Sequence, residues 1–230
     1  MAFTGFPKDF FTFFEELNDN NTRDWFMDNK PRYETNIVAP CLDFIEAIAP
    51  PLAEISPHFL AIPKKMGGSM FRIYRDIRFS KDKTPYKTHA GLQFRHVLGK
   101  NAHAPGFYVH LSTDEILIGG GIWQPPSPVL ANIRKRIDSH SDTWLAGQST
   151  KGFIKSFGKM SAGNPLKRPP RGYNDDHPMI DDLKKRSFFM MADAKRADTY
   201  TPEFVTKVIN VFADAAPMMA FLCTAVDAPF

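Results

Sequence analysis

The spacing of apolar residues changes twice along this chain, and these changes limit the folds that it can adopt. Across residues 7–55 apolar side chains recur every three or four positions, which predicts amphipathic helices. Pro31 should interrupt or restart the second of these helices, and Pro50 and Pro51 should break or kink the third. We therefore expect a helical layer at the start of the chain.

Alternation replaces helical spacing after Lys65. Runs rich in Ile, Val, Phe and Tyr are separated by Gly, Pro, Asn and Asp, a pattern typical of strands and turns. A hairpin loop is expected at residues 112–115. The strands are predicted at residues 66–79, 92–97, 107–111 and 115–123. A largely antiparallel sheet follows from these runs.

Helical spacing then returns. Helices are expected at residues 126–139, 142–157, 179–185 and 202–226, with a strand at 187–192 and an ordered loop at 163–178. This order of helices and strands along the chain favours an α+β class, with a mostly antiparallel sheet flanked by N-terminal and C-terminal helices. No linker-like run divides the chain, so we expect a single domain over residues 1–230.

Composition indicates the kind of core and the cellular compartment to expect. Phe occurs 21 times, which predicts a Phe-rich core. Cys41 and Cys223 lie in apolar contexts without a CxxC pair, and the chain start does not resemble a signal peptide, so a reducing cytoplasm is expected. Residues 215–226 are apolar but too short to cross a bilayer, and we interpret them as a buried terminal helix rather than a membrane segment.

Basic residues are concentrated in two stretches. Residues 64–100 contain ten Lys or Arg against two acids, Asp76 and Asp82, and residues 151–172 contain six with no acid. The chain as a whole has a formal net charge of +4, so the rest of it is acidic. This asymmetry is typical of proteins with an anionic partner. Dispersal over a solvated face is the alternative, above all for the second stretch.

The densest chemical information lies in residues 71–91, FRIYRDIRFSKDKTPYKTHAG. In a strand, alternation would place Arg75 on an apolar face between Ile73 and Ile77. A guanidinium there needs a carboxylate, backbone carbonyls or an anionic ligand, because burying it without a partner is costly. The opposite face would carry the groups from which phosphate and carboxylate sites are built: Arg72, Tyr74, Asp76 and Arg78.

An anion site and a ladder of salt bridges both fit this segment. In the ladder, Asp76 would pair with Arg72 or Arg78. The segment has too few acids for its basic residues, which favours the anion site. We expect the ligand to be bound by Arg72, Arg75, Arg78, Lys83, Lys87 and Arg171, and protons to be handled by Asp76, Tyr86 or His89.

The same segment, followed by GFYVHL and GGGIWQP, resembles the Domain of Unknown Function 2461 family of conserved hypothetical, mainly bacterial proteins. The runs NNTRDWF at residues 20–26, KRPPRGY at 167–173 and DHP at 176–178 match the same pattern. The resemblance covers nearly the whole chain and implies one full-length domain with its site at the motif positions. It implies no established activity, substrate or cofactor.

Other motifs give weaker signals. No dinucleotide fingerprint or P-loop is present, and the histidines lack the spacing that would indicate zinc, so no metal site is expected and the cofactor stays open. Asp175, Asp176 and His177 offer ligands for Mg²⁺ or for acid–base chemistry, but capping of the helix after Pro178 is the favoured role of Asp176 or His177.

Three functions are compatible with these observations. The favoured one is a pocket for a small phosphorylated or carboxylated molecule, with or without catalysis. The second is nucleic-acid binding, in which aromatic residues among the basic ones would stack on bases, although Phe71 and Phe79 fall on the expected core face. The third is a non-catalytic module that docks an acidic protein. The aromatic residues of the second interpretation are Phe71, Tyr74, Phe79, Tyr86 and Phe94.

Overall fold

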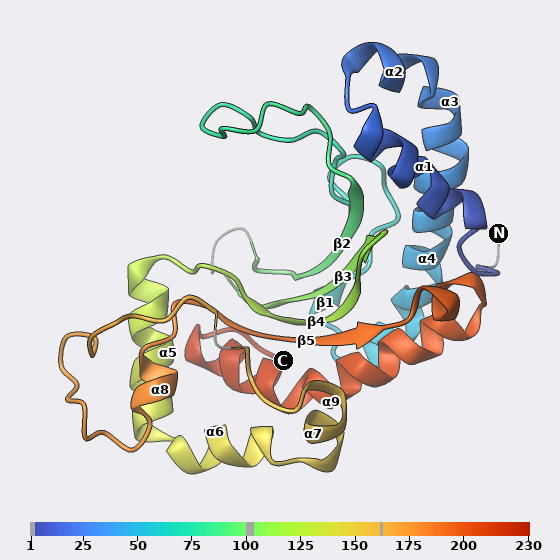
Figure 1. Ribbon diagram of the computed structural model, residues 1–230. Helices are drawn as coiled ribbons and strands as arrows, with labels where there is room; N and C mark the ends of the chain where they lie inside the picture. The colour runs from blue at the N-terminus through green and yellow to red at the C-terminus, as the bar shows by residue number, and fades with distance from the viewer. Residues whose placement is uncertain (1–2, 100–103, 162) are drawn as a thin grey trace.

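A computed structural model describes residues 3–99, 104–161 and 163–230 of the protein (Figure 1). The N-terminal helices are α1 (Lys8–Asp19), α2 (Arg23–Asp28), α3 (Lys30–Tyr33), the π-helical turn η1 (Glu34–Val38) and α4 (Ala39–Ile55). The strands are β1 (Phe59–Leu60), β2 (His89–His96), β3 (Gly106–Ser112), β4 (Ile116–Ile122) and β5 (Phe188–Ala194). The later helices are α5 (Ser127–Ser139), α6 (Ser141–Gln148), α7 (Lys151–Phe157), α8 (Ile180–Leu183), the 3-10 turn η2 (Arg196–Tyr200) and α9 (Glu203–Ala225).

The strands form one antiparallel sheet in the order β1-β2-β3-β4-β5. In the β2–β3 register, His89 stands opposite Ser112. The β3–β4 hairpin closes with a hydrogen bond from the Ser112 N–H to the Glu115 carbonyl (3.1 Å). The α+β class is therefore confirmed, as are the strands predicted within residues 92–123 and at 187–192.

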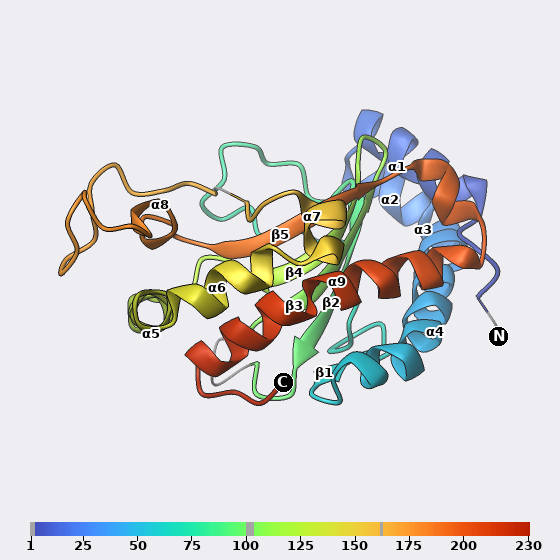
Figure 2. The same ribbon diagram turned by 90° about the horizontal axis from the view of Figure 1, so that it is seen from below.

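Alternation along the strands gives the sheet two different faces. One face, which includes Leu92 and Val109, is fully buried, and the stacked rings of Phe107 and Phe212 (4.5 Å) join it to α9. Figures 1 and 2 show α9 on one side of the sheet and the loop that precedes β2 on the other. That other face carries half-buried polar and aromatic side chains: His89, Gln93, Tyr108 and His110.

Phenylalanine supplies much of the core. The rings of Phe6, Phe10, Phe44 and Phe204 contact one another with centroid separations from 4.7 to 6.2 Å. These residues come from the chain start and from α1, α4 and α9, so the cluster joins the N-terminal helices to the last helix. The predicted Phe-rich core is confirmed.

Helix α4 continues through Pro50 and Pro51, where we expected a break or a kink. Each proline removes one backbone hydrogen bond. Leu52 beside them is fully buried, which indicates that tertiary packing of the apolar face keeps the segment helical. The restart expected at Pro31 is confirmed, because Pro31 lies in the first turn of α3.

The strand expected at residues 66–79 is wrong. Residues 71–88, which we call the arm, instead form two irregular segments that precede β2 in the sequence and project from the sheet (Figure 1). We call these two segments the legs of the arm. The Arg75 N–H donates to the Pro85 carbonyl (2.9 Å) across the legs. Pro85 has no N–H to donate in return, so this pairing does not extend into a regular ladder.

The position of Phe79 also differs from the prediction. Alternation survives in the arm, since Ile73 is buried while Arg72 and Tyr74 are exposed. Phe79, expected to face the core, is instead 95% exposed. The tip of the arm projects beyond the sheet, so its apolar side has no core to face.

Two helical stretches, Lys30–Ile55 and Glu203–Ala225, are long and apolar enough to cross a membrane by length and composition. Both contribute side chains to the folded core, and Phe44 and Phe212 have no exposed surface. The second stretch includes the predicted terminal helix, which is buried as expected. No membrane span is indicated.

Candidate functional site

Arg75 pairs with a carboxylate, which is one of the three kinds of partner expected for it from the sequence. Its guanidinium donates to Asp82 Oδ2 (2.5 Å) and to the Thr84 hydroxyl, and its side chain is 26% exposed. Hydrogen bonds from the Thr84 backbone N–H, and then from Arg75, lower the pKa of Asp82 to about 2. This group fixes the outer half of the arm.

Asp76 and Arg78 pair with each other on the surface of the arm. Arg78 donates from Nε and from one terminal nitrogen to the two oxygens of Asp76, at 2.9 and 2.7 Å. These hydrogen bonds lower the pKa of Asp76 to about 2. The pairing of Asp76 with Arg78 proposed in the salt-bridge alternative is present, and both oxygens of Asp76 are engaged.

The remaining cations of the arm have no carboxylate partner among the described residues. Lys83 donates to the Ile77 carbonyl (2.9 Å) and Lys87 to the Arg72 carbonyl (2.8 Å). Those bonds orient the ammonium groups without neutralising them. The arm contains six basic residues against two acids, so four positive charges stay uncompensated within it.

Asn21 attaches the arm to the N-terminal helices. Its side-chain N–H donates to the Tyr86 carbonyl (3.0 Å), and the Tyr86 N–H donates to its carbonyl oxygen (3.1 Å). The Tyr86 ring stacks on the buried ring of Phe26 at 4.1 Å, and burial raises the pKa of its phenol. Thr22 caps α2, accepting from the Trp25 N–H (3.3 Å).

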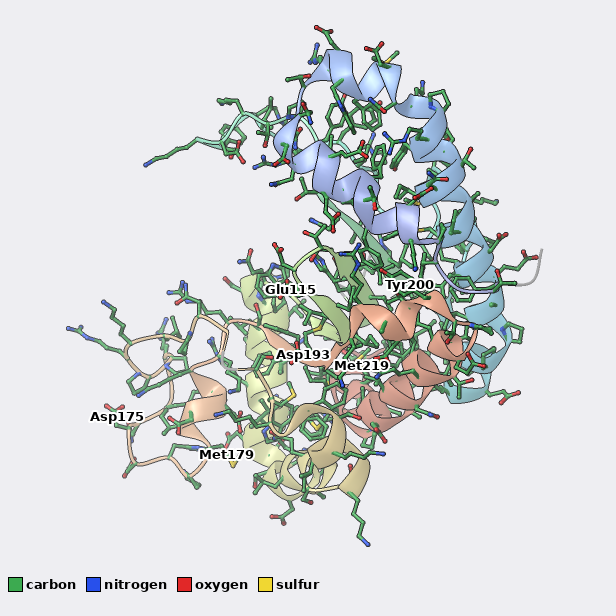
Figure 3. The ribbon with its side chains drawn as sticks, turned by 45° about the vertical axis from the view of Figure 1, so that its right-hand side comes forward. Glu115, Asp175, Met179, Asp193, Tyr200 and Met219 are labelled. Atoms are coloured by element: carbon green, nitrogen blue, oxygen red, sulfur yellow. The ribbon has the colours of Figure 1, made fainter. Side chains whose placement is uncertain are left out.

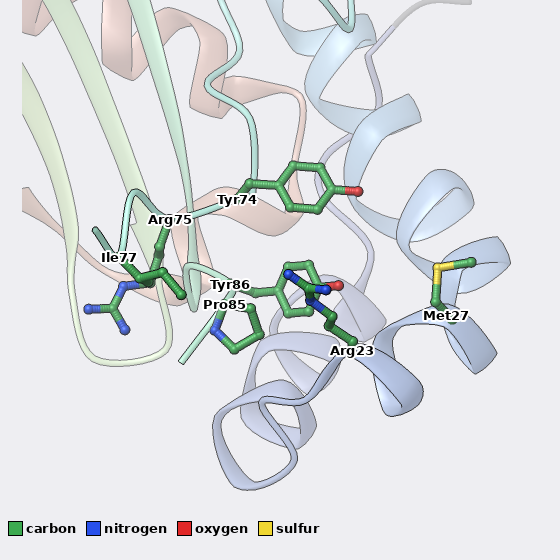
Figure 4. Close-up of a pocket in the computed structure, with 7 residues that line it drawn as sticks. All are labelled: Arg23, Met27, Tyr74, Arg75, Ile77, Pro85 and Tyr86. Carbon is green, nitrogen blue, oxygen red and sulfur yellow. The ribbon is translucent and has the colours of Figure 1, made fainter. Parts of the chain in front are cut away.

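Two hollows lie at the base of the arm and share Arg75 and Tyr86. One has a volume of about 320 Å³, and Figure 4 shows Arg23 beside the Tyr86 ring within it. The other has a volume of about 300 Å³ and is polar. The first is lined by Arg23, Met27, Tyr74, Arg75, Ile77, Pro85 and Tyr86. The second is lined by Asn18, Asn21, Arg75, Asp82, Thr84, Tyr86, Lys87, Thr88 and His89.

The structure therefore brings some predicted site residues together and not others. Arg75, Tyr86, Lys87 and His89 border the second hollow, whereas Asp76 borders neither. Asn21 was not predicted, although it lies in the NNTRDWF run. No pattern local to that run shows that its partner is 65 residues away.

Arg171 lies apart from the arm. It is exposed in the loop before α8, which lies at the other end of the sheet (Figure 1). Figure 3, in which Asp175 of the same loop is labelled, shows the same separation from the N-terminal helices. Arg171 and the cations of the arm thus occupy different parts of the molecule.

Neither a metal cluster nor a reactive thiol is found in residues 3–99, 104–161 and 163–230. Those ranges contain no group of three or more His, Cys, Asp or Glu side chains that could hold a metal ion. His177 accepts from the Met179 N–H (3.1 Å) just before α8 and contacts Asp138 (3.1 Å), but no side chain caps α8 at Met179, so the capping role predicted for Asp176 or His177 is wrong. Cys41 and Cys223 are buried and unbonded, and burial raises the pKa of the Cys223 thiol to about 12.

Comparison with known proteins assigns the family. No curated protein and no solved structure matches the chain. One family model, described as "Conserved hypothetical protein (DUF2461)", matches residues 9–221. That range includes the N-terminal helices, the arm, the sheet and most of α9. The chain therefore belongs to the DUF2461 family of conserved hypothetical proteins.

Proposed function

We propose that the protein binds a small phosphorylated or carboxylated molecule in the second hollow, at the base of the arm. The observation that carries this proposal is the uncompensated charge of the arm beside a polar hollow of about 300 Å³. That volume is at the lower end of the range of small-molecule sites. The buried, unbonded cysteines support a cytoplasmic location.

Lys87 is the cation best placed for the ligand. It borders the hollow, lies 5.4 Å from the centroid of the Phe71 ring, and has its pKa lowered by burial and by Arg72. An anion would relieve both effects, because it supplies opposite charge to a partly desolvated ammonium. Thr88 and Thr84 offer hydroxyl groups to the same ligand. Tyr86 and His89 are the bordering groups that would exchange protons with it.

A thermal-shift titration with inorganic phosphate, sugar phosphates and small dicarboxylates, at low and at high salt, tests this proposal. We expect stabilisation by at least one of these anions to persist at high salt, because a ligand that binds the native state raises its stability by mass action. Lys87→Met should abolish the shift. Lys81→Met is the matched control, since it removes an exposed charge from the same arm outside both hollows. Equal loss in both variants would refute a defined site.

Nucleic-acid binding by the tip of the arm is the second candidate. Phe79 is 95% exposed, and the Arg78 guanidinium lies 5.8 Å from its ring centroid. Tyr74, at 56% exposed, adds a second accessible ring, whereas Phe94 is fully buried and cannot stack on a base. Exposed rings among cations suit unpaired bases and a phosphate backbone.

Fluorescence anisotropy with a labelled single-stranded oligonucleotide at several salt concentrations separates the two candidates. The second candidate predicts binding that weakens steeply with salt and is reduced in Phe79→Ala. Trp123→Ala is the control, since it removes another exposed aromatic ring (65%) outside the arm. Absence of binding at low salt would eliminate the second candidate.

A further inference from the structure

The face of the sheet opposite α9 carries a connected group of titratable side chains. His89 on β2 and His110 on β3 have ring centroids 4.4 Å apart. The Tyr108 hydroxyl lies 3.2 Å from Nδ1 of His110, and Glu115 Oε1 lies 3.8 Å from Nε2 of the same ring. His110 thus lies at the centre of the group, in contact with the second imidazole, the phenol and the carboxylate.

Gly91 leaves room for this arrangement. It stands opposite His110 in the β2–β3 register. A Cβ atom at Gly91 would lie 2.7 Å from the Tyr108 hydroxyl oxygen and 3.0 Å from Cδ2 of Phe71. Any side chain there would therefore displace the Tyr108 ring, and glycine allows its hydroxyl to reach His110.

The two imidazoles are neutral in the unliganded protein at neutral pH. Burial, and to a smaller extent the nearby His110 and Lys87, lower the pKa of His89 to about 4. Burial also lowers the pKa of His110, against the opposing effect of Glu115. Two imidazoles this close bind their protons as a coupled pair, so the first proton opposes the second.

His89 connects this group to the proposed ligand site. It borders the second hollow together with Lys87, Thr88 and Asp82. An oxyanion in that hollow would supply an acceptor and a negative charge beside the imidazole. A neighbouring opposite charge typically moves a pKa by about 1–3 units toward the charged form, which would raise the pKa of His89 from about 4 to between about 5 and 7 and favour its protonation in mild acid.

We propose that His89 and His110 form a proton-binding pair that recognises a phosphate-type oxyanion, taking up one proton from solvent as the anion enters. His89 donates the resulting N–H to an anion oxygen, while His110, held by Tyr108 and Glu115, positions the His89 ring. This inference rests on the proposed function and narrows its ligand class to oxyanions such as phosphate monoesters. The charged and titratable groups that face the pair are Lys87, Arg75 and Asp82 around the hollow and Tyr108 and Glu115 on the sheet.

Isothermal titration calorimetry with inorganic sulfate tests the proposal. Sulfate mimics the shape and charge of phosphate but has no proton to exchange near neutral pH. Titrations of the whole 230-residue chain in buffers of different ionisation enthalpy give the number of protons taken up per anion bound. At about pH 5.5, above the pKa of about 4 that His89 has without the anion, we expect uptake of up to about one proton, and a dissociation constant that falls by up to about tenfold for each pH unit of acidification.

Variants of the two histidines provide the controls. His89→Gln/His110→Gln keeps hydrogen-bonding side chains at both positions but cannot bind the proton, so we expect uptake near zero and weaker sulfate binding. His140→Gln, which replaces an exposed histidine next to α5, should leave uptake unchanged.

The outcomes separate this inference from the proposed function. Absence of both phosphate and sulfate binding would refute the proposed function and the inference together. Binding without proton uptake would refute the inference alone and leave the anion site in place. Uptake that persists in the double variant would likewise refute the inference, because the proton would then bind elsewhere.

Discussion

Asn21 pairs with the backbone of Tyr86 through two hydrogen bonds, at 3.0 and 3.1 Å, although the residues are 65 positions apart. The asparagine amide carries a donor and an acceptor on one group, so it pairs with a peptide unit as a neighbouring strand would. The Asn21 side chain thus makes the hydrogen bonds to Tyr86 that the backbone of a neighbouring strand would make in a sheet. Asn21 therefore helps to hold the second leg of the arm beside the second hollow, together with the stacking of Tyr86 on Phe26.

Replacing Asn21 by Ala should loosen the arm. The Tyr86 N–H and carbonyl would lose their partners while remaining partly buried, so we expect the free energy of unfolding to fall by about 1–2 kcal/mol. Hydrogen exchange at the Tyr86 amide should become faster. Asn164→Ala is the control, because Asn164 is exposed and makes no side-chain hydrogen bond among the described residues. Equal effects of the two substitutions, measured by urea denaturation, would contradict the anchoring role.

Phe79 should be dispensable for folding. Its ring is 95% exposed, so Phe79→Ala should change the free energy of unfolding by less than about 0.5 kcal/mol. Phe94 is fully buried beside Phe212, and Phe94→Ala should cost about 3–5 kcal/mol. Urea denaturation of both variants checks this contrast. A large loss in Phe79→Ala would mean that the ring packs against the protein in solution.

Much of the fold could be predicted because its helices and strands have local apolar periods. Phe10 and Leu17 mark the buried face of α1, and Leu92 and Val109 mark the buried face of the sheet. The spacing of apolar residues alone does not show whether a segment lies inside a sheet or projects beyond its edge. The arm has the alternation of a strand, so Phe79 was predicted to be buried.

The candidate site could be predicted only in part. Arg75, Tyr86, Lys87 and His89 are close in sequence and also lie together in space, since the second leg of the arm leads directly into β2. His110 joins His89 through the β2–β3 register, and that register depends on the lengths of the intervening segments. Sequence analysis therefore singled out His89 and did not single out His110.

Gly91 should tolerate no side chain without disturbing Tyr108. The Cβ atom of Gly91→Ala would lie 2.7 Å from the Tyr108 hydroxyl, and such overpacking costs about 1–3 kcal/mol. Gly106→Ala is the matched control in the adjacent strand, where the nearest atoms would lie at an ordinary 3.4 Å. We expect Gly91→Ala to lower the melting temperature more than Gly106→Ala does, and to shift the NMR signals of the His110 ring. Equal behaviour of the two variants would show that Tyr108 can move aside freely.

His89 should make the stability of the unliganded protein sensitive to mild acid. Its pKa is about 4 in the folded protein against an ordinary value of 6.5, so the unfolded chain binds the proton first as the pH falls. The stabilisation is therefore complete above pH 6.5 and is lost progressively as the pH falls toward 4. Because the side chain is partly exposed, we expect the loss from this group to be on the order of 1–2 kcal/mol.

Free energies of unfolding measured across this pH range in the wild type and in His89→Gln check this prediction. The advantage of the wild type over the variant should shrink on acidification, because the glutamine cannot bind the proton. His140→Gln should keep the pH dependence of the wild type. Parallel curves for the wild type and His89→Gln would show that His89 titrates alike in the folded and unfolded chains. Burial would then not be what keeps the pair neutral.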